Sequence, residues 1–183
     1  MSFQYRFEAL DEDEWPRGEF TPADKRVSAR FDSAWRQTLE LLEKETRLIH
    51  ARPGSVVIGT FHRRYDVLRS GQLRPETKMP DNPGVVVKFE VYDKEQKRYV
   101  PASFECDQFL QWKDNVRAVA LALEALRLVD RYKVGRVGAQ YVGYKALPPA
   151  PLTLSGMTPE AAAEELAKIA PWSAQEILSD ADV

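Results

Sequence analysis

The sequence predicts an α+β domain in which a small antiparallel sheet packs against two main helices, followed by a short helical C-terminal tail. Two segments show helical periodicity, at residues 32–51 and about 107–133, and short β-rich segments occupy 56–104 between them. Helices and strands that segregate along a chain in this way are typical of α+β folds. The tail is expected at 148–183.

The longer helix is the most regular element. Its start is predicted at Asp107, which can act as the N-cap, and its end near Lys133, before Gly135 and Gly138. Apolar side chains recur along it every three or four positions, which indicates that one broad face is buried. These positions are Phe109, Trp112, Val116, Val119, Leu123 and Leu126.

A narrow charged stripe follows the same helix. It consists of Lys113, Arg117, Glu124, Arg127 and Arg131. Four of the five are basic, so the stripe is either a solvated face or a docking face for an acidic or phosphate-bearing partner.

The earlier helix should begin at Asp32 or Ser33 and run to about Ala51, before Pro53–Gly54. Alternating or β-branched residues predict the strands that follow, and Pro101 places the last of them at a sheet edge or a bulge. The expected strands are Val56–Phe61, Val85–Tyr92 and Arg98–Phe104, with a hairpin of Tyr65–Arg69 and Gln72–Leu73 around the turn Ser70–Gly71.

The chain divides into an N-terminal arm at 1–31, a core module at 32–147, and a Pro-rich linker with short helices at 148–183. In the arm, Phe3, Tyr5 and Phe7 alternate as in a short edge strand. Trp15 and Phe20 are expected to anchor the arm on the core.

Charge is unevenly distributed although the net charge is only −2. Residues 1–51 carry −3, residues 52–145 carry +6 and residues 146–183 carry −5. A basic middle with acidic ends is compatible with polyanion binding, and the acidic ends can equally fold back on the basic body.

Composition predicts a cytoplasmic protein with no membrane partner. Cys106 is the single cysteine, which rules out an intramolecular disulfide and favours a reducing compartment. The acidic start lacks the apolar core of a secretory signal. The longest apolar run, Ala118–Leu123, is far shorter than the roughly 20 residues of a spanning helix.

No catalytic, metal or cofactor-binding residues are predicted. His50 and His62 lack metal-ligand spacing to Cys106 or to a carboxylate. The thiol precedes a helix, where its pKa could be lowered, but no histidine is near it in sequence. An enzyme that uses Cys106 and Asp107 is a further alternative, besides the two binding functions described below.

The candidate partner-binding surface combines basic and aromatic residues, a mixture suited to phosphate contact and base stacking. The alternative is that its tyrosines pack the linker against the core. Its residues are Lys113, Arg117, Arg127, Arg131, Tyr132, Gln140, Tyr141 and Lys145.

Several of these segments resemble a set of uncharacterised proteins from actinobacteria and their phages. The resemblance rests on Cys106-Asp107-x-Phe109-x-x-Trp112-Lys113-Asp114-Asn115-x-Arg117-Ala118, on Ala120–Arg127, on Val129–Tyr132, and on Gln140-Tyr141-x-Gly143–Leu147. It is dense over Val85–Leu147 and weaker from Trp15 to Gln72.

Those proteins are often described as J-domain chaperones, because many resemble this module followed by a J-domain. The His-Pro-Asp tripeptide of a J-domain is absent here, since Ala51 follows His50 and Arg63 follows His62. Residues 172–183 look like the beginning of a J-domain cut short, so the chain is either the front module alone or a truncation. The resemblance implies a non-enzymatic interaction module with a protein partner, and nucleic-acid binding is the alternative.

Overall fold

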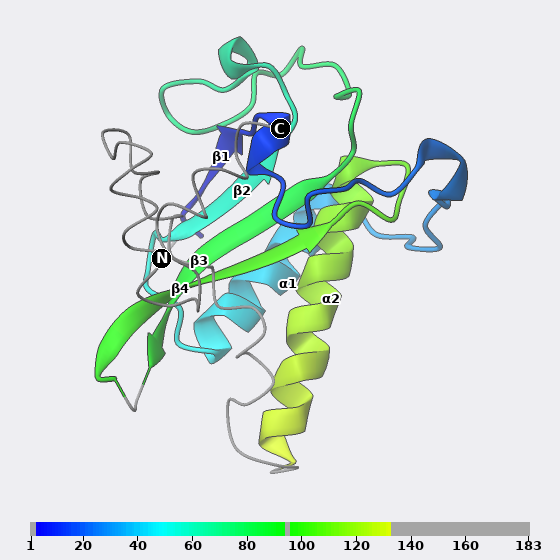
Figure 1. Cartoon of the computed structure of the whole chain (residues 1–183). Coiled ribbons are helices and arrows are strands. Elements are labelled where there is room, and N and C mark those ends of the chain that lie inside the picture. Colours follow the sequence, from blue (N-terminus) through cyan, green and yellow to red (C-terminus); the bar gives the residue numbers. More distant parts are fainter. Residues whose placement is uncertain (1–2, 94–95, 133–183) are drawn as a thin grey trace, which may run out of the picture. The chain divides into compact units, whose positions relative to one another are not determined.

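A computed structural model describes residues 3–93 and 96–132 of the chain (Figure 1). They belong to one compact unit, Met1–Ala146. The predicted tail helices, and the candidate residues Gln140, Tyr141 and Lys145, lie outside the described residues.

Four strands form one sheet in the order β1-β2-β3-β4. Their bounds are Tyr5–Ala9 (β1), Val56–Thr60 (β2), Val85–Asp93 (β3) and Arg98–Cys106 (β4). The pairs β2–β3 and β3–β4 are antiparallel, as predicted, whereas β1 and β2 are parallel. The α+β class is therefore confirmed, but the sheet is mixed. A helix between β1 and β2 supplies the long connection that parallel neighbours need.

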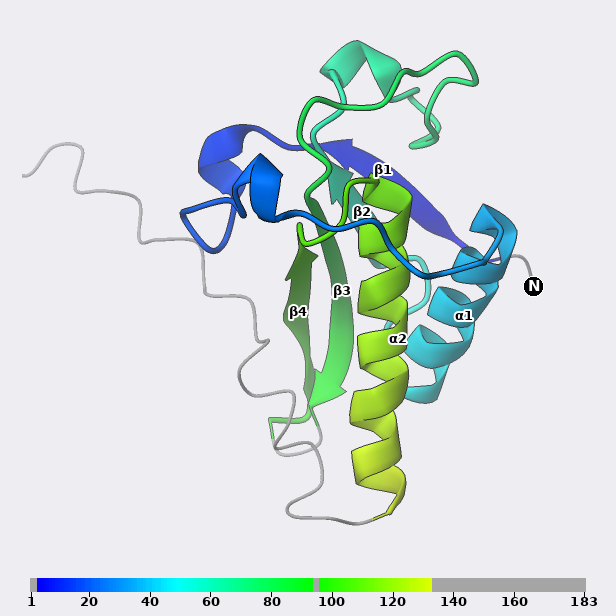
Figure 2. The same cartoon turned by 90° about the vertical axis from the view of Figure 1, so that its right-hand side faces the viewer.

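Helices α1 (Trp35–Leu48) and α2 (Trp112–Arg131) lie side by side against one face of the sheet (Figure 2). Both begin later than predicted. The residue before α1 is Ala34, whose N–H donates to the side chain of Gln37 at 2.9 Å, so neither Asp32 nor Ser33 is its cap.

Asp107 does not cap α2, because its carboxylate is committed elsewhere. It accepts hydrogen bonds from the backbone N–H of Thr21 at 2.6 Å and from the Thr21 hydroxyl at 2.9 Å. The side chain is buried, and it ties the N-terminal segment to the end of β4. Phe109, predicted inside the helix, lies before it, where its backbone bridges Val27.

The main core fills the space between the sheet and the two helices. Leu42 of α1, Ile58 and Val87 of the sheet, and Val116 and Leu123 of α2 are all fully buried there. The part of the predicted apolar stripe that belongs to α2 is thus buried, with Trp112, Val116, Val119 and Leu123 in the core.

A smaller cluster covers the opposite face of the sheet. Trp15 stacks on Phe20 with ring centroids 4.9 Å apart, and both rings contact Phe61. Leu10 and Val86 complete the cluster. The predicted anchoring of the arm by Trp15 and Phe20 is confirmed, and the arm is also part of the sheet through β1.

The loop between β2 and β3 bears directly on the candidate site. It contains the short 3-10 helix η3 (Arg64–Asp66), and the predicted turn at Gly71 is present, with φ +78°. The carbonyl of Gly71 accepts a hydrogen bond from the N–H of Phe7 at 2.6 Å, which fixes the loop to β1. Two other 3-10 helices, η1 (Glu12–Glu14) and η2 (Ala23–Lys25), lie in the N-terminal arm.

Candidate functional site: an aromatic pocket

A cavity of about 310 Å³ lies where β1, the starts of α1 and α2, and the β2–β3 loop come together. We call it the aromatic pocket. It is lined by Tyr5, Phe7, Trp35, His62, Gln72, Leu73, Arg74, Pro75, Thr77, Met79, Gln111, Trp112 and Lys113. Cavities of roughly 300–1,000 Å³ with apolar walls and a few polar groups are typical of ligand sites.

Contacting aromatic rings form the apolar part of the lining. Trp112 is central: its ring centroid lies 5.1 Å from that of Trp35 and 5.7 Å from that of Phe7, both in edge-to-face geometry. Tyr5 contacts Phe7 in the same manner, at 5.7 Å. Edge-to-face contacts of this kind stabilise the arrangement of the rings beyond their buried area, so the rings hold the apolar wall of the pocket in place.

His62 continues this ring network. Its imidazole meets Trp112 edge-to-face at 5.3 Å, and its Nδ1 shares a 2.8 Å hydrogen bond with the Thr60 hydroxyl. Burial lowers the pKa of His62, Asp66 raises it and Lys113 lowers it, with burial the largest effect. The pKa of His62 therefore lies below the usual value of 6.5, and its ring is neutral at pH 7.

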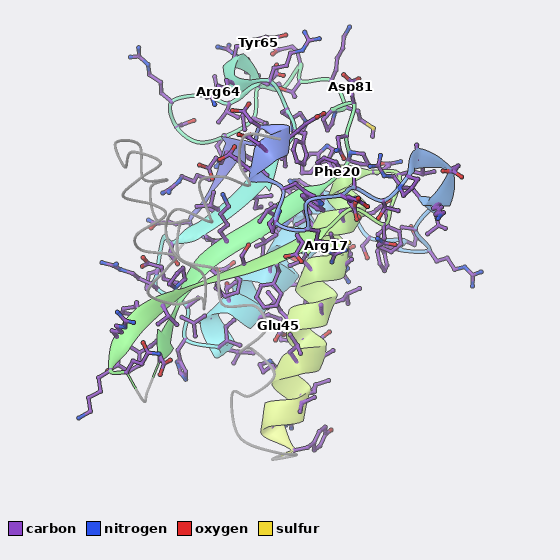
Figure 3. The ribbon with its side chains drawn as sticks, in the orientation of Figure 1. Arg17, Phe20, Glu45, Arg64, Tyr65 and Asp81 are labelled. Atoms are coloured by element: carbon purple, nitrogen blue, oxygen red, sulfur yellow. The ribbon has the colours of Figure 1, made fainter. Side chains whose placement is uncertain are left out.

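The opposite wall is the β2–β3 loop, which is held in place by its own polar contacts. Gln72 donates its side-chain N–H to the carbonyl of Tyr5 at 3.1 Å, and Arg74 donates Nε to the carbonyl of Tyr65 at 2.8 Å. Figure 3 shows Tyr65 projecting outward from this loop. Met79, on the same loop, is 55% exposed at the rim of the pocket.

The structure separates the candidate residues that the sequence grouped together. Lys113 lies at the aromatic pocket, with its Nζ 5.6 Å from the centre of the Trp112 ring. Arg131 and Tyr132 are exposed at the far end of α2, which at 1.5 Å per residue is roughly 27 Å from Lys113.

The middle of the charged stripe faces α1. Arg127 donates to both carboxylate oxygens of the buried Glu45, and Arg117 donates to the Gln37 carbonyl at 3.3 Å. Lys44 of α1 approaches the carboxylate of Glu124 at 3.4 Å. Arg117, Glu124 and Arg127 of the stripe therefore contact α1, and the stripe is not a continuous surface facing solvent.

A second, more open hollow of about 440 Å³ adjoins the start of α1. Its lining includes the acidic Asp32 and Glu40 as well as the basic Lys44 and Arg117, and it has no aromatic residue. The lining is mixed in charge and contains few apolar side chains, so this hollow is a weaker candidate than the aromatic pocket.

The Cys106 thiol is placed as a structural group. Its Sγ donates to the Asn115 side-chain oxygen at 3.2 Å, and Asn115 is itself buried. Burial is the main reason that the pKa of Cys106 lies above its usual value, although the Gln108 backbone N–H and Arg17 act in the opposite direction. A raised pKa keeps the thiol protonated and weakly nucleophilic at neutral pH.

Sequence reasoning did not identify the pocket. The sequence pattern predicts Trp112 only as a buried position of the longer helix, and it gives His62 no metal-ligand spacing. The available signal was the presence of aromatic residues in three separate segments, which the structure shows to be β1 (Tyr5 and Phe7) and the starts of α1 (Trp35) and α2 (Trp112). Their convergence at one point depends on the parallel pairing of β1 with β2.

Searches against protein-family models, curated proteins and solved structures find no match to this chain. Within residues 3–93 and 96–132, no group of three or more His, Cys, Asp or Glu side chains is placed to hold a metal ion. In the same part of the chain, no helix is both long and apolar enough to cross a membrane.

Proposed function

We propose that this chain is a non-enzymatic recognition module for a protein partner, and that the aromatic pocket receives a side chain of that partner. The observation that carries the proposal is the preformed, ring-lined cavity around Trp112. Aromatic anchors inserted into such pockets dominate the binding energy of many protein interfaces.

The surroundings of the pocket favour a protein partner over an isolated small molecule. Met79 and Tyr65 are 55% and 61% exposed on the loop that forms one wall. Exposed Met and Tyr side chains are enriched in protein interfaces, and a flexible Met adapts to the surface that covers it. A partner that inserts one residue into the pocket can therefore also cover Met79 at its rim and contact Tyr65 on the same loop.

A setting for such a module comes from the resemblance to proteins described as J-domain chaperones. In longer proteins of that kind, the module would supply recognition while the J-domain recruits the chaperone. The His-Pro-Asp tripeptide is absent from this chain, so the proposal assigns recognition alone to it.

Nucleic-acid binding has less support. Two of the four stripe cations, Arg117 and Arg127, are engaged with α1, and Lys113 and Arg131 lie at opposite ends of α2. A polyanion needs closely spaced cations to gain from counterion release. We expect no salt-sensitive binding of single- or double-stranded nucleic acid at 50–200 mM salt, and steeply salt-dependent binding would reverse the preference.

The proposal is tested by selecting binders from a random peptide library on the immobilised protein and measuring their affinities. Gln111→Trp and Met79→Trp each add bulk at an exposed residue of the pocket lining. Val129→Trp adds the same bulk at an exposed position near the other end of α2 and is the matched control. Equal melting temperatures would show that all three variants fold.

We expect the selected peptides to bind the wild type and the Val129→Trp control alike, and to bind each pocket variant at least tenfold more weakly. Peptides that bind all four proteins equally would place the interaction elsewhere. A library that yields no binder would contradict the proposal.

A further inference from the structure

The charged side chains that line the aromatic pocket are all basic. Lys113 and Arg74 belong to its lining, and no aspartate or glutamate does. Neither cation forms an ion pair with another described residue: Lys113 contacts the Trp112 ring, and Arg74 contacts a backbone carbonyl. With His62 neutral, the lining carries two positive charges and no negative one, although Asp66 acts on His62 from outside the lining, and a bound ligand of negative charge would complement the two cations.

The start of α2 adds to this positive potential. Gln111, Trp112 and Lys113 all line the pocket, and Trp112 is the first residue of the 20-residue helix α2. The backbone N–H groups of the first helical residues have no intrahelical acceptor, and the helix dipole places partial positive charge at this end. A helix start of this kind is favourable for an anion, although it does not define a site by itself.

An unpaired hydroxyl lies in the same lining. The Thr77 Oγ1 atom is buried and has no hydrogen-bond partner among the described residues. Arg26 Nε and Arg117 Nε are also buried without partners, but neither belongs to the aromatic pocket. Buried polar atoms are ordinarily hydrogen-bonded, so the Thr77 hydroxyl is a donor without an acceptor. Because the atom has almost no exposed surface, it reaches a ligand in the pocket only after the Thr77 side chain rotates about χ1.

Size restricts what the pocket can accept. About 310 Å³ is at the lower limit for ligand cavities, so a single aromatic residue is a better fit than an extended segment. A ligand that matches both the aromatic wall and the two cations must then carry its ring and its negative charge on the same residue. The last residue of a polypeptide provides both on one residue when its side chain is aromatic, since the α-carboxylate lies beside the ring and no chain has to leave on the other side.

Resting on the proposed function, we propose that the aromatic pocket captures the carboxyl-terminal residue of a partner protein when that residue is aromatic. The ring packs against Trp35 and Trp112. The α-carboxylate is neutralised by Lys113 and Arg74, and it accepts a hydrogen bond from the Thr77 hydroxyl once that side chain has rotated toward the pocket. Capture of a terminal carboxylate is an established mode of peptide recognition.

The test compares the pentapeptide N-acetyl-Gly-Ser-Gly-Ser-Phe as the free acid, as the C-terminal amide, and with Ala in place of Phe. Affinities are measured by calorimetry against the full chain and two variants. Lys113→Gln removes a charge at the pocket, and Lys25→Gln removes one from an exposed position on η2, outside the pocket lining.

We expect the free acid to bind at least tenfold more tightly than the amide and the Ala peptide. Lys113→Gln should reduce the preference for acid over amide by at least threefold, and Lys25→Gln should leave it unchanged. Acid and amide that bind alike, or a preference that survives Lys113→Gln intact, would overturn the inference. A Thr77→Val variant provides a second readout, with the same reduction expected.

Failure of this inference can be told from failure of the proposed function. If library peptides with internal aromatic residues bind at the pocket while free-acid termini do not, recognition stands and the carboxylate specificity falls. If neither class binds, both fall. N-acetyl-phenylalanine serves as the last arm: affinity equal to that of the pentapeptide would assign the pocket to small aromatic acids and overturn a protein terminus as the source.

Discussion

Arg127 on α2 donates hydrogen bonds to both carboxylate oxygens of Glu45 on α1, and the Glu45 side chain is fully buried. Figure 3 shows Glu45 where the two helices meet. A paired buried carboxylate is tolerated, but the loss of its partner leaves a charge in a poorly solvated position. The pair therefore holds α1 and α2 in register, and it fixes the walls from which Trp35 and Trp112 reach the pocket.

We predict that Arg127→Met lowers the free energy of unfolding by about 3 kcal/mol, because the buried Glu45 then keeps only the half-exposed Lys44, whose Nζ lies 3.4 Å from its carboxylate. Urea denaturation measures the change. Arg131→Met, at an exposed position four residues on, should change it by less than about 0.5 kcal/mol. The double variant Glu45→Met with Arg127→Met should recover most of the loss. An Arg127→Met protein as stable as the wild type would show that the pair contributes little.

Gly71 is predicted to be irreplaceable at the loop that walls the pocket. Its φ is +78°, and a Cβ there would lie 2.6 Å from the Cβ of Arg6. We expect Gly71→Ala to destabilise the protein by about 3 kcal/mol, through strain and displacement of the loop. Gly18→Ala is the control, since Gly18 has φ +74° but no atom within 4 Å of an added Cβ. It should cost about 1 kcal/mol. Equal losses for the two variants would refute the steric argument.

The buried imidazole of His62 should make stability depend on pH. Its pKa is lowered, chiefly by burial, so below about pH 6.5 the unfolded chain binds a proton that the folded chain resists. The contribution of neutral His62 to the free energy of unfolding is complete above pH 6.5. It declines as the pH falls toward the pKa that His62 has in the folded chain, by at most about 1.4 kcal/mol per pH unit. Urea unfolding at pH 7.5, 6.5 and 5.5 measures it.

His62→Gln isolates this contribution, because every other titrating group remains. Between pH 7.5 and pH 5.5, the wild type should lose more unfolding free energy than His62→Gln does. A constant difference in unfolding free energy between the two proteins would mean that His62 titrates alike in the folded and unfolded chains.

The Cys106 thiol is predicted to be unreactive in the folded protein. Burial raises its pKa, and its Sγ is hydrogen-bonded to Asn115. Reaction with Ellman's reagent at pH 7.5 should be at least tenfold slower than in 6 M guanidinium chloride, where the thiol is exposed. Equal rates in the two conditions would revive the enzyme alternative built on this residue.

Much of the fold could be predicted because it follows from short-range patterns. Alternation in Val85–Tyr92 and the heptad-like spacing from Trp112 to Leu126 correspond closely to β3 and α2. The helix starts could not be placed because caps compete for partners across the chain. Asp107 has the right chemistry for a cap, but Thr21, 86 residues away, takes its carboxylate.

The candidate site was harder to predict for a related reason. Helical spacing put Arg117 and Arg127 on one stripe correctly, yet spacing within one helix cannot reveal that Gln37 and Glu45 face them from another. The aromatic pocket has no local signature at all. It exists because parallel pairing of β1 with β2 brings Phe7 against Trp112, which lies more than 100 residues later.

The central claim, that partners bind at the aromatic pocket, is tested most directly by NMR of the tryptophan indole N–H groups during titration with a library-selected peptide. Trp35 and Trp112 belong to the pocket, whereas Trp15 packs on the opposite face of the sheet and donates its indole N–H to the Glu19 carbonyl. We predict that the Trp35 and Trp112 signals shift with saturation while the Trp15 signal stays in place. Saturable binding that leaves Trp35 and Trp112 unshifted, or that moves Trp15 alone, would contradict the claim.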